Sequence, residues 1–146
     1  MNVIFICTGN TCRSPMAEGF LNSKRLYGVN AESRGLMASG EKVSEKSVRA
    51  FLGFGVDISS HISKQFSKED LSADKIICLS KSHADILLGL GADKDKVSVL
   101  GNGISDPYGQ SQEVYNVCAK EILRKIDFLV YSGFFTSVKV ESASEK

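Results

Sequence analysis

A cysteine and an arginine stand close together near the start of the chain, in the segment Cys7–Ser14, which reads CTGNTCRS. Between them, Thr8, Gly9 and Asn10 are small or turn-forming residues, which allow the backbone to curl so that successive N–H groups point inward. Arg13 adds a planar guanidinium that can hold two oxygens of a phosphoryl group. The spacing and the residue types therefore predict a loop that binds phosphate or a similar oxyanion, made of Thr8, Gly9, Asn10, Thr11, Cys12, Arg13 and Ser14.

Cys7 begins this loop, where its thiol would meet a bound phosphoryl group. A helix is expected to start at Ser14, and its N-terminus would bring partial positive charge to the same point. Together with Arg13, this charge should lower the pKa of the Cys7 thiol and favour the nucleophilic thiolate. Ser14 could donate a hydrogen bond to that thiolate or be an ordinary helix cap. A cysteine that ends a buried strand can also be a plain core residue. The prediction of a nucleophile therefore depends on the strand, the loop residues, Arg13 and the helix together, and not on Cys7 alone.

A second candidate for chemistry is Asp106, in the segment DPYG that lies between Gly101 and Gly109. Displacing an alkoxide, a phenoxide or a guanidine from phosphorus requires a proton for the leaving group, and a carboxylic acid can supply it. If Cys7 takes the phosphoryl group, a phosphocysteine forms. The Asp106 side chain could then take a proton from the water that attacks this phosphocysteine. Asp-Pro-Tyr-Gly is also well composed for a plain turn. We assign the acid and base role to Asp106 because the cysteine loop is present.

The elements that could position these residues alternate along the chain. Short apolar segments predict strands at residues 2–7, 30–33, 75–79 and 96–100, and periodic patterns predict helices at residues 14–27, 45–54, 80–90 and 112–131. This βαβαβαβα order predicts an α/β fold, with a four-stranded parallel, doubly wound sheet and helices on both faces. Ligands bind at the carboxyl ends of the strands in such folds. The phosphate-binding loop after the first strand is therefore the expected site.

Length and composition fit one soluble domain. The chain has 146 residues, of which 42% are hydrophobic and 24% charged, and its net charge of +1 argues against a nucleic-acid-binding protein. No apolar run approaches the length of a membrane span, and the N-terminus does not read as a signal peptide, so we expect a cytoplasmic protein without membrane contact. We expect one domain over residues 1–132 and a partly frayed tail over residues 133–146, in which Phe134 and Phe135 could dock back.

The four cysteines are Cys7, Cys12, Cys78 and Cys118. Their spacing is typical neither of a disulfide-rich secreted scaffold nor of a zinc site. Cys78 in a strand and Cys118 on the last helix are expected in the core. We expect no metal and no cofactor.

The segment CTGNTCRSP resembles the signature loop of the low-molecular-weight protein-tyrosine phosphatases, and the resemblance covers nearly the whole chain. It includes Ser33, the pair Ser60-His61 and the element Asp106-Pro107-Tyr108. The resemblance implies that phosphorylated proteins are the substrates. It also implies that Cys7 is the nucleophile and that Arg13 binds the phosphate and the transition state. Asp106 would be the general acid in the first step and the general base in the second.

The same resemblance implies that Asn10, Ser33 and His61 form a hydrogen-bond network that holds the loop open. We prefer this structural role for His61 to that of a base in a Cys–His protease. In the family, the second loop cysteine can form a reversible disulfide with the nucleophile and protect it from over-oxidation. Cys12 would be that partner of Cys7, or simply a small residue of the loop wall.

Thr11 and Tyr108 depart from the pattern of the tyrosine-specific members. Those members usually carry an aliphatic residue at the position of Thr11 and a second tyrosine at the position of Gly109. The loop, the Asp-Pro-aromatic-Gly element and ESRG at residues 32–35 look like the bacterial protein-arginine phosphatases of the family. A hydroxyl on the wall suits a guanidinium with several N–H donors, whereas hydrocarbon suits a phenyl ring. We therefore favour phosphoarginine over phosphotyrosine, with Thr11 and Tyr108 as the specificity residues.

Three other functions share this kind of loop. An arsenate-reductase-like redox enzyme needs two further cysteines in a mobile segment, and only Cys78 lies between Cys12 and Cys118. A phosphocysteine carrier would have no use for the acid and base at Asp106. A module that only binds phosphoproteins would need neither Cys7 nor Asp106.

Overall fold

The computed structural model describes residues 1–136, and its central element is a four-stranded sheet. The strands are β1 (Asn2–Cys7), β2 (Asn30–Gly35), β3 (Lys75–Cys78) and β4 (Val97–Val99), in the spatial order β2-β1-β3-β4. Every neighbouring pair is parallel. The predicted α/β fold with a parallel, doubly wound sheet is confirmed.

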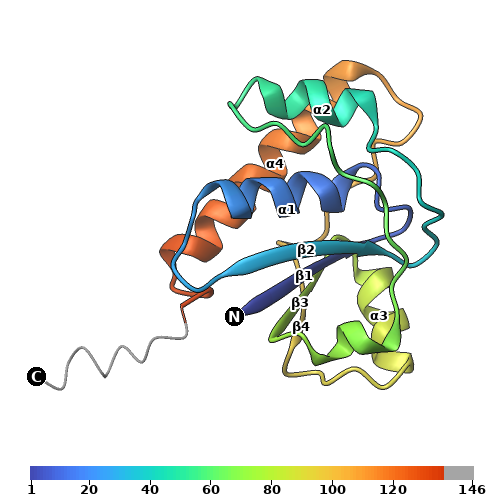
Figure 1. Ribbon diagram of the computed structural model, residues 1–146, viewed down its shortest axis with the longest axis vertical. Helices are drawn as coiled ribbons and strands as arrows, with labels where there is room; N and C mark the ends of the chain where they lie inside the picture. The colour runs from blue at the N-terminus through green and yellow to red at the C-terminus, as the bar shows by residue number, and fades with distance from the viewer. Residues whose placement is uncertain (137–146) are drawn as a thin grey trace, which may run out of the picture.

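The helices cover both faces of the sheet (Figure 1). They are α1 (Arg13–Ser23), α2 (Glu45–Leu52), α3 (Lys81–Gly89) and α4 (Gln112–Tyr131), with a short 3-10 helix, η1, at Lys68–Ser72. On one face, α1 and α4 contact each other and α2 packs against α4. On the other face, α3 packs next to β3 and β4. No helix in the described part of the chain is both long and apolar enough to cross a membrane.

Strand β1 supplies the centre of two hydrophobic cores, because successive side chains of a strand point to opposite faces. Val3, Phe5 and Cys7 pack in the core with α1 and α4, whereas Ile4 and Ile6 pack in the core with α3. A strand that is buried on both faces reads as a continuous apolar run, which explains the sequence of this segment. The burial also fixes the end of β1, and with it the start of the loop that follows.

The loop after β1 lies where the strand order reverses. From β1 the chain crosses to β2 on one side, and the later strands β3 and β4 lie on the other side of β1. Such a switch point is where open α/β sheets bind ligands. The chain after β4 also returns to this edge, because the Ile104 amide donates a hydrogen bond of 2.8 Å to the carbonyl of Leu79, just after β3. The fold therefore brings the two predicted catalytic segments to one edge of the sheet.

Most predicted boundaries agree with the structure within two residues, and the exception is the end of α1. This helix stops at Ser23 instead of residue 27. Arg25 has a φ of 52° and Gly28 a φ of 73°, and such left-handed conformations end a helix. The chain can then turn and enter β2 at Asn30.

The described part of the tail packs against the body of the protein, as expected for Phe134 and Phe135. Phe135 is buried in the core with α1 and α4, and Phe134 packs against the same core. The Lys75 ammonium lies 4.3 Å from the centre of the Phe134 ring. The fraying expected further along falls on residues 137–146, which lie outside the described residues. The domain boundary at residue 132 stays a prediction.

Candidate active site

The segment between β1 and α1 forms one wall of a cavity of about 220 Å³. The residues that line this cavity are Cys7, Thr8, Gly9, Asn10, Thr11, Cys12, Arg13, Glu41, Asp106 and Tyr108. The three residues expected to be catalytic therefore meet at one cavity, although they come from distant parts of the chain. Glu41 is the lining residue that the sequence analysis did not single out.

The Cys7 thiol is almost completely enclosed, since only 2% of this residue is exposed. Its Sγ lies 2.8 Å from Ser14 Oγ and accepts a hydrogen bond of 3.2 Å from the Asn10 amide. Burial raises the pKa of the Cys7 thiol, whereas Ser14, Arg13 and the Asn10 amide lower it. The net direction is upward. The expected lowering is therefore wrong for the loop as it stands, because desolvation of the sulfur outweighs the donors around it.

Arg13 is the first residue of α1, and the loop after β4 holds its guanidinium. Nη1 donates a hydrogen bond of 2.9 Å to the carbonyl of Ile104, and Nη2 lies 3.5 Å from Asp106 Oδ2. The Arg13 side chain is 6% exposed. This arrangement joins the loop of Cys7 to the loop of Asp106 and fixes a positive charge between them.

Asp106 forms the turn that its sequence context suggested and also lines the cavity, while its acid and base role stays a prediction. Its Oδ1 accepts a hydrogen bond of 3.1 Å from the Tyr108 amide, as in an ordinary Asx turn. Its Oδ2 faces Arg13, and the side chain is 49% exposed. A carboxyl group that lines the cavity and also reaches solvent can exchange protons with water. Tyr108 lines the same cavity and is mostly exposed.

Asn10 connects the loop to its surroundings, as expected from the family resemblance. Its φ of 60° is left-handed, a conformation that asparagine tolerates better than most residues. The buried side chain donates to Ser14 Oγ at 2.7 Å and to Ser33 Oγ at 2.9 Å. The side-chain oxygen of Asn10, Oδ1, accepts a hydrogen bond of 2.8 Å from the Lys64 amide. One side chain therefore ties together the loop, the first turn of α1, strand β2 and the segment before η1.

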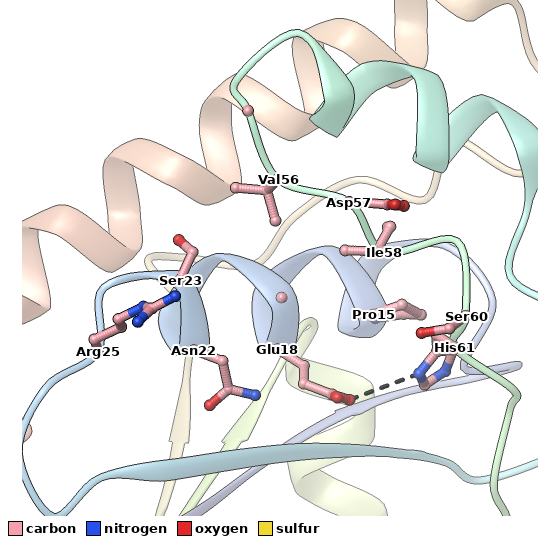
Figure 2. Close-up of a pocket in the computed structure, with 12 residues that line it drawn as sticks. Pro15, Glu18, Asn22, Ser23, Arg25, Val56, Asp57, Ile58, Ser60 and His61 are labelled. Carbon is pink, nitrogen blue, oxygen red and sulfur yellow. Dashed lines mark ion pairs between the residues drawn. The ribbon is translucent and has the colours of Figure 1, made fainter.

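Glu18 and His61 extend this network behind the loop. His61 Nε2 lies 3.0 Å from the backbone carbonyl oxygen of Asn10, which supports the structural role expected for this histidine. Glu18 accepts a hydrogen bond of 2.6 Å from Ser33, and its Oε1 lies 3.7 Å from His61 Nδ1. Figure 2 shows these two side chains facing each other in a second cavity, of about 410 Å³, between α1 and the segment after α2. Sequence reasoning missed Glu18, although a helix places it on the same face as Ser14.

His83 is another contact of the loop that sequence reasoning missed. Its Nε2 lies 3.0 Å from Thr8 Oγ1, and its Nδ1 lies 2.9 Å from Oγ of Ser80, the N-cap of α3. Burial and the nearby Arg13 lower the pKa of His83 to about 4, despite an opposing effect of Asp106. A neutral imidazole therefore connects α3 to the loop. The sequence did contain a signal for this contact, because His83 lies in the first turn of the helix that follows β3, and β3 pairs with β1.

Gly35, at the end of β2, leaves room for the loop. A Cβ atom at this position would lie 2.7 Å from the Thr8 carbonyl oxygen and 2.9 Å from Asn10 Cβ. Neither neighbour is the free end of a flexible side chain, so a larger residue would displace the loop backbone. This close approach gives a physical reason for the glycine of ESRG.

Thr11 and Cys12 complete the side of the loop nearest α2 and α4. The Thr11 carbonyl accepts a hydrogen bond of 2.9 Å from the amide of Ser44, the N-cap of α2. Cys12 Sγ lies 3.3 Å from the hydroxyl of Tyr115 on α4. Both Cys7 and Cys12 are free thiols in this structure, and the reversible disulfide between them stays a prediction.

Cys78 and Cys118 lie in the core, as expected. Burial raises the pKa of each thiol to about 12. Both thiols are therefore protonated at neutral pH.

The arrangement suits a bound anion. Within the described residues, no side chain caps the N-terminus of α1 and no acidic residue stands in its first turn. A helix N-terminus in this state attracts anions, and a phosphate group is a common one. Arg13 adds a full positive charge beside the Cys7 sulfur. The site can thus hold a phosphoryl group against a thiol, with a carboxyl group nearby. No cluster of His, Cys, Asp or Glu side chains among residues 1–136 has an arrangement suited to a metal ion.

Comparison with known proteins identifies relatives over most of the chain. Residues 2–143 match the family model described as low molecular weight phosphotyrosine protein phosphatase. The protein-arginine-phosphatase of Geobacillus stearothermophilus is 36% identical over 87% of this chain and 92% of its own. The low molecular weight protein-tyrosine-phosphatase PtpB of Staphylococcus haemolyticus is 33% identical over 84% of this chain and 93% of its own.

A solved structure also matches closely. It is a mutant of the YwlE arginine phosphatase with a phosphorylated active-site serine. The TM-score is 0.86 at 30% identity, and the match covers 94% of this chain and 98% of the other.

Proposed function

Because this chain belongs to the low molecular weight phosphotyrosine protein phosphatase family, we propose that it hydrolyses phosphorylated side chains of proteins through a phosphocysteine at Cys7, with a preference for phosphoarginine. The observation that carries this proposal is that Cys7, Arg13 and Asp106 line one cavity at the N-terminus of α1. A nucleophile, an anion-binding charge and a proton donor are the three groups that the reaction requires.

In the first step, Cys7 releases its thiol proton to solvent and attacks phosphorus as the thiolate, and the bond from phosphorus to the leaving group breaks. Arg13 and the N–H groups at the start of α1 stabilise the charge on the phosphoryl oxygens. Asp106 gives its proton to the departing atom, which is a nitrogen in phosphoarginine or an oxygen in phosphotyrosine. The products of this step are a phosphocysteine, a carboxylate at Asp106 and a guanidinium or a phenol.

In the second step, water attacks the phosphocysteine and Asp106 takes a proton from it. The sulfur leaves as a thiolate, and Ser14, with Oγ at 2.8 Å from Sγ, can donate a hydrogen bond to it. Inorganic phosphate then leaves the loop. The phosphorylated active-site serine of the YwlE mutant supports a covalent phosphoenzyme for this chain as well.

The preference for phosphoarginine rests on the wall of the cavity. Thr11 lines it and offers a hydroxyl where an aliphatic residue would offer hydrocarbon. A guanidinium with several N–H donors can use that hydroxyl, and a phenyl ring cannot. Tyr108 also lines the cavity and can flank either group.

The alternative functions fit this site less well. A redox relay to a third cysteine has no suitable partner in the described residues, because Cys78 and Cys118 are buried and protonated at neutral pH. A carrier that only stores phosphate, or a module that only binds it, would leave Asp106 without a role.

The mechanism uses no metal or cofactor, and we propose a cytoplasmic enzyme that acts on phosphorylated proteins. Chelating agents should leave the activity unchanged. Vanadate, which resembles phosphate, should inhibit by occupying the loop. Loss of activity with a chelator would contradict this cysteine mechanism.

The experiment that tests the preference measures phosphate release from two peptides of the same sequence, one with phosphoarginine and one with phosphotyrosine. The wild type should have the higher kcat/KM for phosphoarginine. Thr11→Ile should reverse the order by removing the hydroxyl, and Cys7→Ala should hydrolyse neither peptide.

Thr11→Ser is the matched control, because it keeps the hydroxyl and should retain the preference for phosphoarginine. A wild type that prefers phosphotyrosine and does not respond to Thr11 would contradict the arginine preference alone. Turnover by Cys7→Ala would contradict the whole mechanism.

A further inference from the structure

Two carboxylates line the catalytic cavity in the described part of the chain, Asp106 and Glu41. Asp106 must carry a proton at the first step, because the leaving group needs one. A protonated carboxyl cannot at the same time neutralise a cation in the substrate. Glu41 is therefore the remaining lining carboxylate that can pair with a cation in the substrate.

The backbone of Glu41 is fixed at the mouth of the cavity. Its amide donates a hydrogen bond of 2.8 Å to Ser63 Oγ, and its carbonyl accepts one of 2.8 Å from the Ser63 amide. The next residue, Lys42, forms an antiparallel bridge with Ile62. These contacts hold the backbone of Glu41 in place, so its side chain starts from a fixed position beside the cavity.

The side chain of Glu41, in contrast, is exposed to solvent. Its carboxylate takes part in no ion pair or hydrogen bond with any other residue among 1–136. Glu45, on the same side of the protein, differs in both respects: it lies outside the cavity and pairs with Arg49 at 3.5 Å. A free carboxylate at the edge of a phosphate-binding cavity would repel the phosphoryl group, so its presence there calls for a cationic partner.

Resting on the proposed hydrolysis of phosphoarginine, we propose that Glu41 binds the guanidinium of that substrate while the phosphoryl group lies in the loop. A phosphorylated guanidine still carries a positive charge and several N–H donors. Carboxylates bind such a planar group through paired hydrogen bonds. The ring of phosphotyrosine offers neither charge nor donors, so a carboxylate that loses water against it gains nothing.

Glu41 would thus act together with Thr11. The threonine hydroxyl is neutral and can serve a donor or an acceptor, whereas the carboxylate selects for charge. No proton transfer in either chemical step involves Glu41. Its effect should appear in substrate binding.

The test compares wild type with Glu41→Gln, a substitution that keeps the shape of the side chain and removes its charge. For the phosphoarginine peptide, kcat/KM should fall about fivefold, mainly through KM, as expected for a charged hydrogen bond near the surface. For the matching phosphotyrosine peptide, it should stay the same or rise. Added salt should weaken phosphoarginine turnover more in the wild type than in the variant, because salt screens the lost attraction.

Glu45→Gln is the control, since it removes a charge from the same side of the protein but outside the cavity. It should leave the ratio of the two substrates unchanged. Equal changes for both peptides in Glu41→Gln, or no change at all, would overturn the role of Glu41. If the wild type fails to hydrolyse phosphoarginine, the proposed substrate is itself wrong and the role of Glu41 falls with it. Phosphotyrosine turnover by the variant shows that it is folded.

Discussion

At the scale of single residues, the chemistry depends on how the Cys7 sulfur is surrounded. The thiol is deeply buried, which favours its neutral form, and Ser14, Arg13 and the Asn10 amide each favour the thiolate. The sequence located all of these groups. It could not show how completely the sulfur is desolvated, because that depends on residues packed around it from the whole core. The direction of the pKa shift was therefore predicted wrongly while the contacts themselves were predicted well.

Ser14→Ala removes the hydroxyl that lies 2.8 Å from the Cys7 sulfur. The pKa of the thiol should rise further, since one of the groups that lower it is lost. The limb of kcat/KM that increases with pH as the thiolate forms should move to higher pH, and kcat/KM at neutral pH should fall about tenfold. The measurements are the pH profile of kcat/KM and the pH dependence of Cys7 alkylation.

Ser47→Ala is the matched control. Ser47 is also a buried serine near a helix N-terminus, but it lies on α2 and its hydroxyl has no hydrogen-bond partner among residues 1–136. Its removal should leave both profiles unchanged. A Ser14→Ala profile that overlays the wild type would show that Ser14 does not act on the sulfur.

At the scale of elements, β2, α1 and α3 converge on the loop and hold it from different sides. β2 contributes Gly35 and Ser33, and α1 contributes Ser14 and Glu18. α3 contributes His83, whose ring lies between Thr8 and Ser80. The existence and order of these elements followed from hydrophobic patterns. The contacts between them did not, because a pattern gives the face of a helix and not the atom that it touches.

His83 should make the stability of the protein sensitive to mild acid. Its folded-state pKa of about 4 lies below the ordinary value of 6.5. The unfolded chain therefore binds a proton before the folded protein does, and stability is lost as the pH falls from 6.5 towards 4. At pH 4.5 this loss should amount to roughly 2 to 3 kcal/mol in the free energy of unfolding.

The measurement is urea denaturation of the wild type and His83→Gln at pH 7 and pH 4.5. The wild type should lose more stability than the variant between these two pH values. Other groups also titrate in this range, so the difference between the two proteins is the informative quantity. Parallel losses would mean that His83 does not stay neutral in the folded protein.

At the scale of the whole molecule, a parallel sheet brings together residues that are far apart in the chain. β1 ends at Cys7, and the chain after β4 returns across β3 so that Asp106 reaches Arg13. The alternation of strands and helices predicted this edge as the site, and the helices and strands were expected within two residues except at the end of α1. Glu41 could not be predicted, because it reaches the cavity from an irregular segment whose course depends on contacts with Ser63.

The most direct test of the central claim is to trap the covalent intermediate on Cys7. Asp106→Asn would be mixed with an aryl phosphate whose phenolate leaves without a proton, so that the first step proceeds and the second lacks its base. Mass spectrometry should then find one added phosphoryl group on the peptide that contains Cys7, and none in the variant that also carries Cys7→Ala. Wild-type turnover without such an adduct, or an adduct on another residue, would contradict the account.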